Sequence, residues 1–355
     1  MPGLLYSSLK PFLYPERLAA IRDGRVPAPV HVRIKPTNVC NHACWFCAYR
    51  SDAVSLGSDM DARARIPRGK MLEIVDDLVA MGVAAVTFSG GGEPLIYPHI
   101  VETVERLAAG GVRIGALSNG SMLRGKVADA FARHATWIRV SIDGWDGPSY
   151  ARSRKVDGEA FDRVLANLAA FAGRGSACAL GASVIVDEAN APHLHDLCRK
   201  LKASGVGHVK LAPCIVRDSG AANDAYHARL TPVVRAQIDR SRRLEDGHFR
   251  IADHYHALGE RFDRTDRCCP MAYLLTVIGA DLSVYTCQDK AYTPGGALGS
   301  IRERGFREFW QSPENARALA AIDPSSTCRH HCVASAKNER LNEFLALDPG
   351  HAMFV

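Results

Sequence analysis

The stretch Cys40-Asn41-His42-Ala43-Cys44-Trp45-Phe46-Cys47 places three cysteines within one short segment. Three thiolates can hold three corners of a four-iron cluster and leave the fourth iron open to a substrate or cofactor. A structural zinc site would instead take a fourth protein ligand and be closed, and His42 is a candidate for that ligand. The surrounding sequence favours the cluster, because the stretch follows a strand-like segment (30–37) and precedes strand–helix units with glycine-rich turns.

The composition is that of an ordinary globular enzyme, with 355 residues of which 47% are hydrophobic and 23% charged. No apolar run approaches the roughly eighteen residues of a membrane span, and residues 1–14 lack a signal-peptide pattern. We therefore expect a cytoplasmic protein with no membrane partner. Eleven cysteines in such a chain indicate metal or redox use rather than disulfides. The net charge of +6, without a Lys/Arg-rich block, gives no indication of nucleic-acid binding.

From residue 30 onward, short β-rich runs alternate with helical patterns, which is typical of parallel βαβ units. The predicted strands lie near 30–37, 84–89, 112–118, 137–143, 179–187 and 208–216. The predicted helices lie near 70–82, 97–110, 124–134, 158–174, 191–204 and 231–245. Six such units predict an α/β fold built on a partial (β/α)6 TIM-like barrel, with its sites at the carboxyl ends of the strands.

The pattern changes after the sixth unit. Residues 217–230 predict a loop, and residues 268–355 carry a second cysteine cluster, a hairpin and a helix near 303–321. The sequence therefore predicts a lead-in (1–29), a barrel domain (30–250) and a small C-terminal α+β domain (251–355).

The spacing Cys40-x3-Cys44-x2-Cys47, with Phe46 before the last cysteine, resembles that of the radical S-adenosylmethionine (SAM) enzymes. Segments 86–94, 117–120 and 139–144 resemble the next strand ends of that family. The resemblance implies a [4Fe-4S] cluster on the three thiolates, with SAM bound at the open iron. It also implies reductive cleavage of SAM to a 5′-deoxyadenosyl radical, which abstracts hydrogen from an unactivated C–H bond. The electron would come from an external donor of the flavodoxin or ferredoxin type.

The same resemblance names the SAM-contacting residues. Gly91 and Gly92 let the backbone approach the cofactor closely, and Glu93 can accept a hydrogen bond from the methionine ammonium. The alternative is that this segment is a tight turn capped by the glutamate. Arg152 is the candidate partner of the methionine carboxylate, with a solvated loop arginine as the equal alternative. Phe46 is a candidate to pack beside adenine, with core packing as the equal alternative. The full set of candidates is Phe46, Gly91, Gly92, Glu93, Ser118, Asn119, Ser141, Asp143 and Arg152.

From Cys268 onward the chain resembles the twitch or SPASM extensions of radical SAM enzymes, which bind auxiliary clusters. Four thiolates suffice for one auxiliary [4Fe-4S] cluster, and the best assignment is Cys269, Cys287, Cys328 and Cys332, with Cys268 as a near-equal candidate for the first position. There are too few cysteines for two clusters, so the shorter twitch form fits better. Leu282 stands where the family usually has glycine, which weakens the prediction of the hairpin turn. A zinc ribbon is the alternative for this set.

Strand alternation identifies candidate substrate residues. In the first strand Val32 and Ile34 should pack outward on helices, which directs the neighbouring side chains into the barrel lumen. Applied to three strands, the alternation directs four cations inward, namely Arg33, Lys35, Arg139 and Lys210. Such a lumen suits an anionic small-molecule substrate. Internal ion pairing that closes the barrel floor is the equal alternative.

Cys214 lies near the end of the sixth predicted strand. A thiol there could return a hydrogen atom to a substrate radical, which would make the net reaction an epimerisation; a buried structural cysteine is the alternative. We expect the outcome to be oxidation or epimerisation of a polar small molecule of anionic or sugar-like character. Modification of a peptide or protein side chain is the main alternative, against which the missing leader-recognition domain argues. A zinc-stabilised, non-enzymatic binding module is the alternative from another class.

Overall fold

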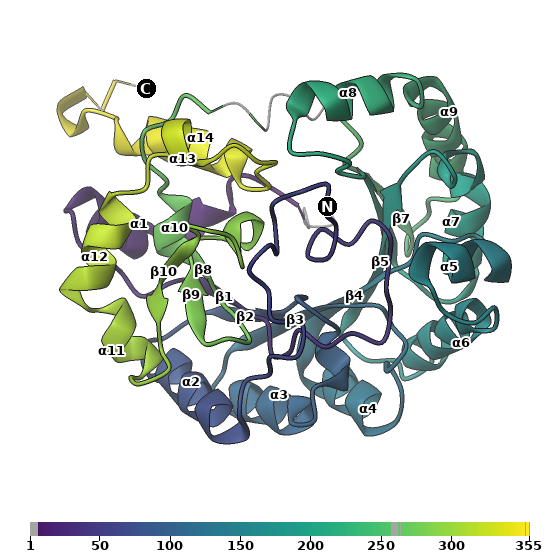
Figure 1. The fold of residues 1–355 in the computed structure, drawn as a ribbon, viewed down its shortest axis with the longest axis horizontal. Coiled ribbons are helices and arrows are strands. Elements are labelled where there is room, and N and C mark those ends of the chain that lie inside the picture. Colours follow the sequence, from purple (N-terminus) through teal and green to yellow (C-terminus); the bar gives the residue numbers. More distant parts are fainter. Residues whose placement is uncertain (1–5, 257–261, 263, 352, 355) are drawn as a thin grey trace.

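The computed structural model describes residues 6–256, 262, 264–351 and 353–354 of the chain. Its strands form one open sheet in the order β10-β9-β8-β1-β2-β3-β4-β5-β6-β7, which curves around a central lumen (Figure 1). Within these residues, no helix has both the length and the apolar character that crossing a membrane requires.

The parallel part of the sheet follows the predicted strand order. Each strand from β1 to β7 pairs in parallel with the next. The six predicted strands correspond to β1 (His31–Ile34), β2 (Ala85–Phe88), β3 (Arg113–Ser118), β4 (Ala135–Ser141), β5 (Ala179–Val186) and β6 (His208–Pro213). The predicted α/β fold with a partial, open barrel is therefore confirmed.

The strand β7 (Arg250–Asp253) was not predicted from the sequence. It extends the parallel sheet beyond β6, and only Ile251 among its residues is buried, so it has no apolar run to mark it. On the other side of the barrel, β8 (Leu275–Ile278) pairs in parallel with β1. β9 (Ser283–Tyr285) and β10 (Ala297–Ser300) then continue the sheet antiparallel. The predicted domain boundary thus lies within β7, and the C-terminal part shares the sheet of the barrel.

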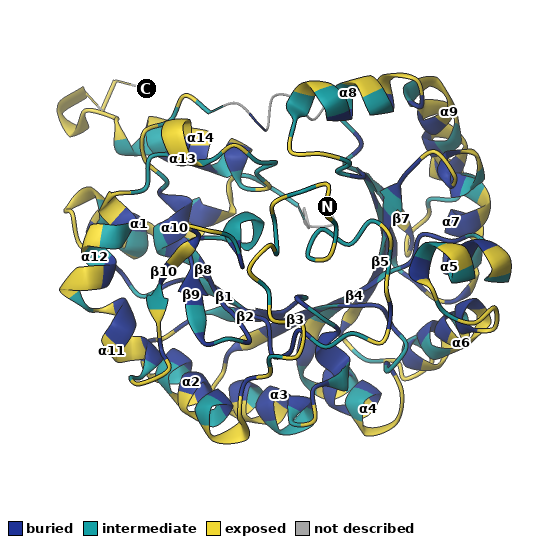
Figure 2. Ribbon diagram, viewed as in Figure 1, coloured by how far each residue is buried: buried dark blue, intermediate teal, exposed yellow. Residues whose placement is uncertain are grey.

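Helices cover the outer face of the sheet (Figure 1). The six predicted helices correspond to α2 (Arg68–Ala80), α3 (Ile100–Ala109), α4 (Gly125–His134), α6 (Ala160–Ala172), α7 (Leu194–Ala203) and α9 (Thr231–Arg242). Their buried sides face the sheet and their exposed sides face outward (Figure 2). The remaining α-helices are α1 (Pro15–Arg22), α5 (Gly147–Arg154), α8 (Gly220–Ala228), α10 (Met271–Leu274), α11 (Phe306–Trp310), α12 (Pro313–Ala320), α13 (Pro324–Thr327) and α14 (Ser335–Leu345). Short 3-10 helices are η1 (Lys10–Leu13), η2 (Pro94–Ile96), η3 (Ala191–His193), η5 (Gln288–Lys290) and η6 (Pro349–His351).

Two helix predictions need correction. The loop predicted over 217–230 contains α8, which begins where the Ser219 side chain accepts from the Ala222 N–H. The single helix predicted near 303–321 is divided into α11 and α12. The division follows from Pro313 at the start of α12, because proline is accepted in a first helical turn but not in a helix interior.

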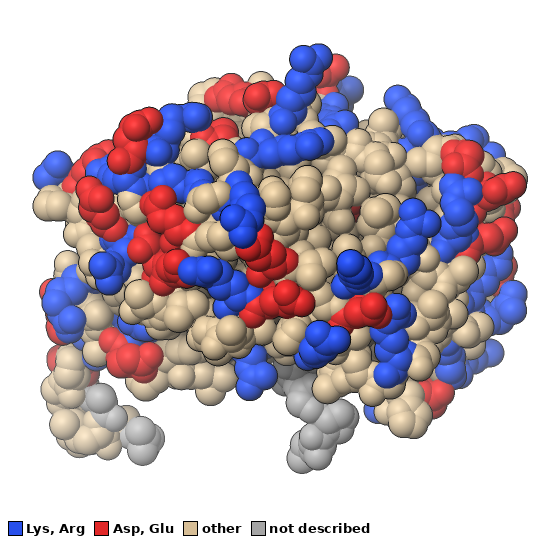
Figure 3. Space-filling model, turned by 90° about the horizontal axis from the view of Figure 1, so that it is seen from below, with Lys and Arg blue, Asp and Glu red and all other residues tan. Residues whose placement is uncertain are grey.

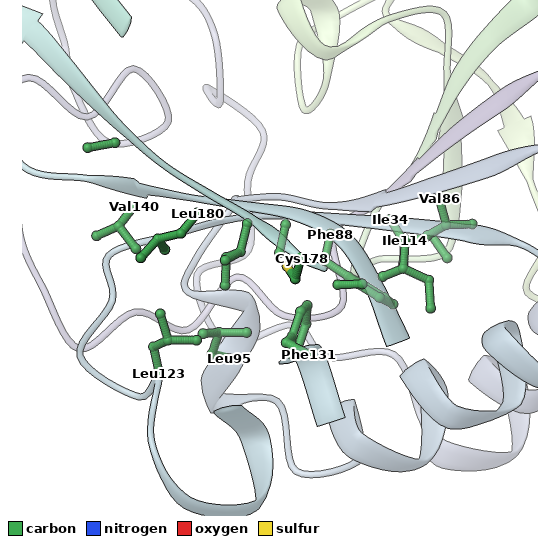
Figure 4. Packing of buried hydrophobic residues seen from close by; sticks show 14 of the residues in the cluster. Ile34, Val86, Phe88, Leu95, Ile114, Leu123, Phe131, Val140, Cys178 and Leu180 are labelled. Carbon is green, nitrogen blue, oxygen red and sulfur yellow. The ribbon is translucent and has the colours of Figure 1, made fainter. Parts of the chain in front are cut away.

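The core lies between the sheet and the outer helices. Val32 and Ile34 of β1 are fully buried, whereas Arg33 between them is only half-buried, as the alternation predicted. Figure 4 shows Phe88 and Ile114 on the side of the sheet where Leu95 and Phe131 lie. Each such side chain contributes about 1.5–3 kcal/mol when fully buried. This apolar outer layer leaves the lumen side of the strands to polar residues.

The predicted hairpin between β8 and β9 is present despite Leu282. The Leu282 N–H donates to the Gly279 carbonyl at 3.0 Å, which closes the turn. Leu282 has a φ of +68°, a left-handed conformation that costs a residue with a Cβ about 1–2 kcal/mol. The leucine side chain is buried in the core, and this burial offsets the cost.

Candidate active site

The loop that follows β1 carries the three N-terminal cysteines, Cys40, Cys44 and Cys47, and all three are half-buried. Burial raises the pKa of Cys44 to about 11, and nearby Cys47 and Cys40 add to the rise. The three thiols therefore lie within electrostatic reach of one another. No group of His, Cys, Asp and Glu side chains in the described residues is arranged to hold a single metal ion. Thiolates that hold a four-iron cluster each bind a different iron atom.

The glycine-rich turn after β2 packs directly on the start of the cysteine loop. A Cβ on Gly91 would lie 1.9 Å from Asn38 Oδ1, and a Cβ on Gly92 would lie 1.9 Å from the Val39 carbonyl oxygen. The Gly92 N–H donates to the Thr37 carbonyl at 3.1 Å. Only glycine permits this approach, so the turn and the thiol loop form one rigid unit. The three cysteine thiols and this close-packed glycine turn fit a [4Fe-4S] cluster with SAM bound beside it.

Glu93 has the capping role that the sequence analysis gave as the alternative. Its Oε1 accepts from the Leu95 N–H at 3.0 Å and from the Ser118 hydroxyl at 2.7 Å. Its Oε2 accepts from the Asn119 N–H at 2.6 Å. Burial raises the pKa of Glu93, and these donors oppose the rise. Glu93, Ser118 and Asn119 are thus brought together at neighbouring strand ends, and contact of Glu93 with a methionine ammonium remains a proposal.

The end of β3 is also tied to the cysteine loop. The Asn119 side-chain amide donates to Asn41 Oδ1 at 2.9 Å, and Asn41 in turn donates to the Ser121 hydroxyl at 2.9 Å. Asn41 stands between the first two cysteines. Asn119 therefore holds the loop that carries the thiols.

Arg152, predicted as a SAM-carboxylate partner, is exposed, and the solvated alternative is the one observed. Arg154 is the buried guanidinium at this site. Its Nη2 donates to Asp143 Oδ2 and to the Ser141 hydroxyl, and its Cζ lies 5.4 Å from the centre of the Phe46 ring. Burial opposes the charge of Arg154, yet its pKa is raised, because Asp143 faces it.

Sequence reasoning missed Arg154 because it missed α5. The signals were present: Asp146 accepts from the Ser149 N–H in a capping box, and a proline opens the first turn. A helix beginning there places Tyr150 and Arg154 on one face, four residues apart, and both are buried. Within the described residues, the buried Nε of Arg154 has no hydrogen-bond partner, so this guanidinium retains a donor for an anionic group.

The second cysteine set converges near the lumen-facing side of β1. Burial raises the pKa of Cys269 to about 12, and the nearby thiols of Cys332 and Cys328 contribute. Burial also raises the pKa of Cys287, with Asp289, Cys332 and Cys269 adding to the effect. The four predicted ligands, Cys269, Cys287, Cys328 and Cys332, therefore lie within electrostatic reach of one another.

Cys268 differs from its neighbour in the chain. It is exposed, and its thiol donates to Asn342 Oδ1 at 3.1 Å. Cys269 Sγ instead accepts from the Asn338 side-chain amide at 3.3 Å, beside the other cysteines. The arrangement favours Cys269 in the set.

Lys35 directly follows the carboxyl end of β1 and is 1% exposed. Its Nζ donates to the Tyr49 hydroxyl at 2.6 Å and to the Gly90 carbonyl. The Tyr49 hydroxyl donates onward to the Gln288 carbonyl at 3.2 Å. Lys35 therefore connects the glycine turn, the cysteine loop and the loop of the second cysteine set, rather than presenting its ammonium to the lumen as predicted for a substrate residue.

Arg139 and Lys210 face inward as predicted, but Tyr6 occupies the space between them. Arg139 Nη1 donates to the Tyr6 hydroxyl at 2.8 Å, and Lys210 Nζ lies 5.5 Å from the centre of the Tyr6 ring. The Tyr6 ring also packs at 4.8 Å against His254. Sequence patterns gave no sign of this contact, since Tyr6 and Arg139 are 133 residues apart. The Tyr6 side chain thus closes part of the lumen, whereas the alternative considered from the sequence was closure by internal ion pairs.

Arg33, like Arg139, is a lumen cation whose guanidinium keeps an unused donor. Within the described residues, its buried Nε has no hydrogen-bond partner. Burial lowers the pKa of Arg33, while the carboxylate of Asp289 opposes this change and Arg139 adds to it. Beside this region, a cavity of about 590 Å³ is lined by residues 49–58 and Asp218.

Cys214 directly follows β6 and is 1% exposed. Its carbonyl oxygen accepts from His227 Nε2 at 2.8 Å, and its Sγ lies 3.9 Å from the same nitrogen. Burial, with a contribution from Asp187, raises the pKa of Cys214 to about 12. The side chain is therefore a neutral thiol at ordinary pH.

Residues 34–201 match the family model of the radical SAM superfamily. The chain is 30% identical over 141 residues to GTP 3′,8-cyclase of Synechococcus elongatus, and the match covers 39% of this chain and 41% of that enzyme. It is 25% identical over 340 residues to mycofactocin maturase MftC of Mycobacterium tuberculosis, covering 90% of this chain and 82% of MftC. The chain thus spans less than half of the cyclase but most of MftC.

Among solved structures, SuiB of Streptococcus suis bound to precursor peptide SuiA matches with a TM-score of 0.61 at 14% identity. That match covers 91% of this chain and 74% of SuiB. A second SuiB structure contains S-adenosylmethionine. These likenesses show a shared fold.

The fold and the family match together indicate an enzyme of the iron–sulfur, SAM-dependent class. The chain contains a radical SAM domain, which spans residues 34–201. A [4Fe-4S] cluster and SAM are the cofactors of the superfamily that this domain matches. The non-enzymatic zinc-binding module considered from the sequence is set aside.

Proposed function

We propose that this enzyme binds its cluster through Cys40, Cys44 and Cys47 and abstracts hydrogen from an unactivated C–H bond of a polar substrate. The observation that carries the proposal is the close packing of the glycine turn on the thiol loop, beside a buried Arg154 with an unused donor. When bound, the cluster and SAM would supply a 5′-deoxyadenosyl radical. A cytoplasmic location is part of the same proposal.

The residues of this chain position SAM and exclude water from it. Arg154, held in place by Asp143, is suited to bind the methionine carboxylate through its remaining donor. The glycine turn admits the methionine half at backbone distance. Phe46, 5.4 Å from the Arg154 guanidinium, closes the apolar side of the site. Arg152 has no part in this arrangement, because it is exposed.

The second cysteine set supports an auxiliary [4Fe-4S] cluster of the twitch type. Its four thiols come from three separate segments that converge next to the loop contacted by Tyr49. Thiolate ligands from four points satisfy a complete cluster. A cluster there would accept the second electron of a substrate oxidation.

The substrate is proposed to be a polar, anionic small molecule bound by Arg33, whose buried Nε has no hydrogen-bond partner within the described residues. The Nε of Arg139 is unpaired among these residues as well, but Nη1 of that side chain already donates to Tyr6. Lys35 supports the surrounding loops, and Arg139 and Lys210 contact Tyr6. Because of these contacts, the proposal gives the last three a supporting role around the lumen rather than direct substrate contact.

Both oxidation and epimerisation are compatible with this site. Epimerisation needs a hydrogen-atom donor, and the neutral thiol form in which Cys214 is held is the form that carries a transferable hydrogen. Deuterium transfer from labelled substrate into 5′-deoxyadenosine tests abstraction itself. Replacing Cys214 by Ala should then abolish inversion but leave 5′-deoxyadenosine formation. Inversion at an unchanged rate would eliminate the donor role.

Modification of a peptide side chain is the second candidate. It is favoured by the similarity to mycofactocin maturase over 90% of this chain and by the fold shared with SuiB, which was solved with a precursor peptide. Parallel assays with deuterated polar small molecules and deuterated peptides distinguish the two substrate classes.

Metal analysis after anaerobic reconstitution tests the cofactor assignment. About eight irons with matching sulfide per chain are expected for two four-iron clusters. Zinc without sulfide would overturn it.

A further inference from the structure

The helix α14 packs against the start of β8 and of its neighbour β1. Asn338 Oδ1 of α14 accepts from the Met271 N–H at 3.0 Å, which joins α14 to α10, the short helix that leads into β8. Leu341 of α14 is fully buried in an apolar cluster against which Leu275 packs. Leu275 in turn is the register partner of His31 in the parallel pairing of β8 with β1. The inner face of α14 is therefore held beside the first residues of β1.

Lys337 lies on this inner face. It precedes Leu341 by four residues, so the two side chains share one side of the helix, and Lys337 is half-buried. Its charge acts on the lumen-facing residues of β1. Burial, with repulsion from Arg33 and Lys337, lowers the pKa of His31 to about 3. A helix from the C-terminal part of the chain thus brings a cation to the barrel lumen.

Lys337 stands where folding alone does not favour a lysine. It is the third residue of α14, and the positive end of the helix dipole disfavours a cation in the first turn. Burial lowers the pKa of Lys337, and the charges that act on it, Arg33 and Lys10, are both positive and add to the change. Residues that break a local rule at a cost to stability are expected at functional sites.

Arg33 supplies a second cation at the same place. Within the described residues, its buried Nε has no hydrogen-bond partner. The carboxylate of Asp289 acts on Arg33, but its Oδ2 already accepts from the Val333 N–H at 3.0 Å. On the outer surface seen in Figure 3, by contrast, Lys and Arg side chains are interspersed with Asp and Glu. Arg33 and Lys337 therefore keep positive charge and donors for a ligand.

We propose that Arg33 and Lys337 bind the phosphate group of a phosphorylated substrate, a proposal that rests on the proposed function and names its substrate class. Two cations suit a doubly charged phosphate better than a singly charged carboxylate, and the arginine fork matches phosphate geometry. Arg33 lies within β1, whereas the cysteine loop follows the carboxyl end of that strand. A substrate held in this way directs its phosphate toward the start of the strands and its reacting C–H bond toward SAM.

Phosphate binding to the apoprotein tests this site without either cluster. Inorganic phosphate is titrated into wild type and Lys337→Met at low ionic strength and followed by calorimetry. We expect Kd to rise about tenfold in Lys337→Met, because a charge-assisted contact is lost. The matched control is Arg340→Met, which removes an exposed cation of the same helix that pairs with Glu343 at 3.0 Å. This control should bind phosphate as wild type does, and acetate should bind wild type about tenfold more weakly than phosphate.

Thermal unfolding separates ligand binding from a structural role of Lys337. Because Arg33 and Lys10 repel Lys337, Lys337→Met should melt no lower than wild type when phosphate is absent. Added phosphate should raise the melting temperature of wild type more than that of the variant, since a ligand that binds only the folded chain stabilises it.

Unchanged phosphate affinity in Lys337→Met would overturn the proposal, as would an equal loss in Arg340→Met or acetate binding as tight as that of phosphate. A marked loss of stability in phosphate-free Lys337→Met would also overturn it, because Lys337 would then have a structural role. Failure of the proposed function has a different signature. The wild-type apoprotein would still bind phosphate, but it would form no iron–sulfide chromophore on reconstitution.

Discussion

Arg154 and Asp143 form an ion pair that is almost completely removed from solvent, with side-chain exposures of 3% and 1%. The same guanidinium nitrogen donates to the Ser141 hydroxyl at 2.9 Å. The Arg154 backbone carbonyl accepts from the Ala43 N–H at 3.0 Å, within the cysteine loop. The pair therefore links the end of β4, the end of α5 and the thiol loop. Removing one partner of such a pair is far more costly than the net contribution of the intact pair.

Replacing Arg154 by Gln is expected to destabilise the protein by about 3–5 kcal/mol, because Asp143 is left buried and uncompensated. It should also weaken SAM binding at least tenfold, since a charge-assisted contact is lost. Denaturant unfolding and equilibrium dialysis with labelled SAM measure the two effects. Arg152→Gln is the matched control, two residues away and exposed, and should change neither. SAM binding of wild-type strength in Arg154→Gln would remove Arg154 from the SAM site.

Replacing Gly92 by Ala tests the packing of the glycine turn. The new Cβ would lie 1.9 Å from the Val39 carbonyl oxygen and 2.5 Å from the Asn38 carbonyl carbon. Because both are backbone atoms, the cysteine loop must move, at a cost of about 1–3 kcal/mol. We expect reduced iron incorporation and a lower melting temperature.

Gly69 of α2 supplies the control for that substitution. No atom lies within 4 Å of a Cβ added there, so Gly69→Ala should be neutral or stabilising by up to about 1 kcal/mol. Equal effects of the two substitutions would contradict the tight packing described for Gly92.

Cys269 and Cys268 can be separated by iron content. Cys269→Ser is expected to lower iron from about eight to about four per chain, because the auxiliary cluster loses a ligand. Cys268→Ser should retain about eight, since its thiol faces Asn342 at the surface. Iron and sulfide determination after identical reconstitution provides the measurement. The opposite pattern would transfer the ligand assignment to Cys268.

The parts of the site that the sequence predicted depend on local patterns. Strand alternation placed Val32 and Ile34 outward with Arg33 inward, because side chains on a strand alternate whatever the distant chain does. Contacts between distant segments had no such signal. Tyr6 reaches Arg139 across 133 residues, and no periodicity reports that pairing. Arg154 was predictable in principle, but only after the helix beginning at Asp146 had been recognised from its capping residues.

Lys35 gives the stability of the apoprotein a pH dependence of known sign. Burial, with repulsion from Arg33, lowers the pKa of Lys35 to about 7 in the folded chain, against about 10.4 when unfolded. Between these values the unfolded chain holds a proton that the folded chain lacks, so stability rises with pH by up to about 1.4 kcal/mol per unit. The substitution Lys35→Met removes this contribution to the pH dependence of stability. Its stability relative to wild type should be greatest below pH 7 and decline toward about pH 10. Urea unfolding across this range measures the slope, with the exposed Lys126→Met as control; parallel slopes in wild type and Lys35→Met would show that Lys35 keeps its proton when folded.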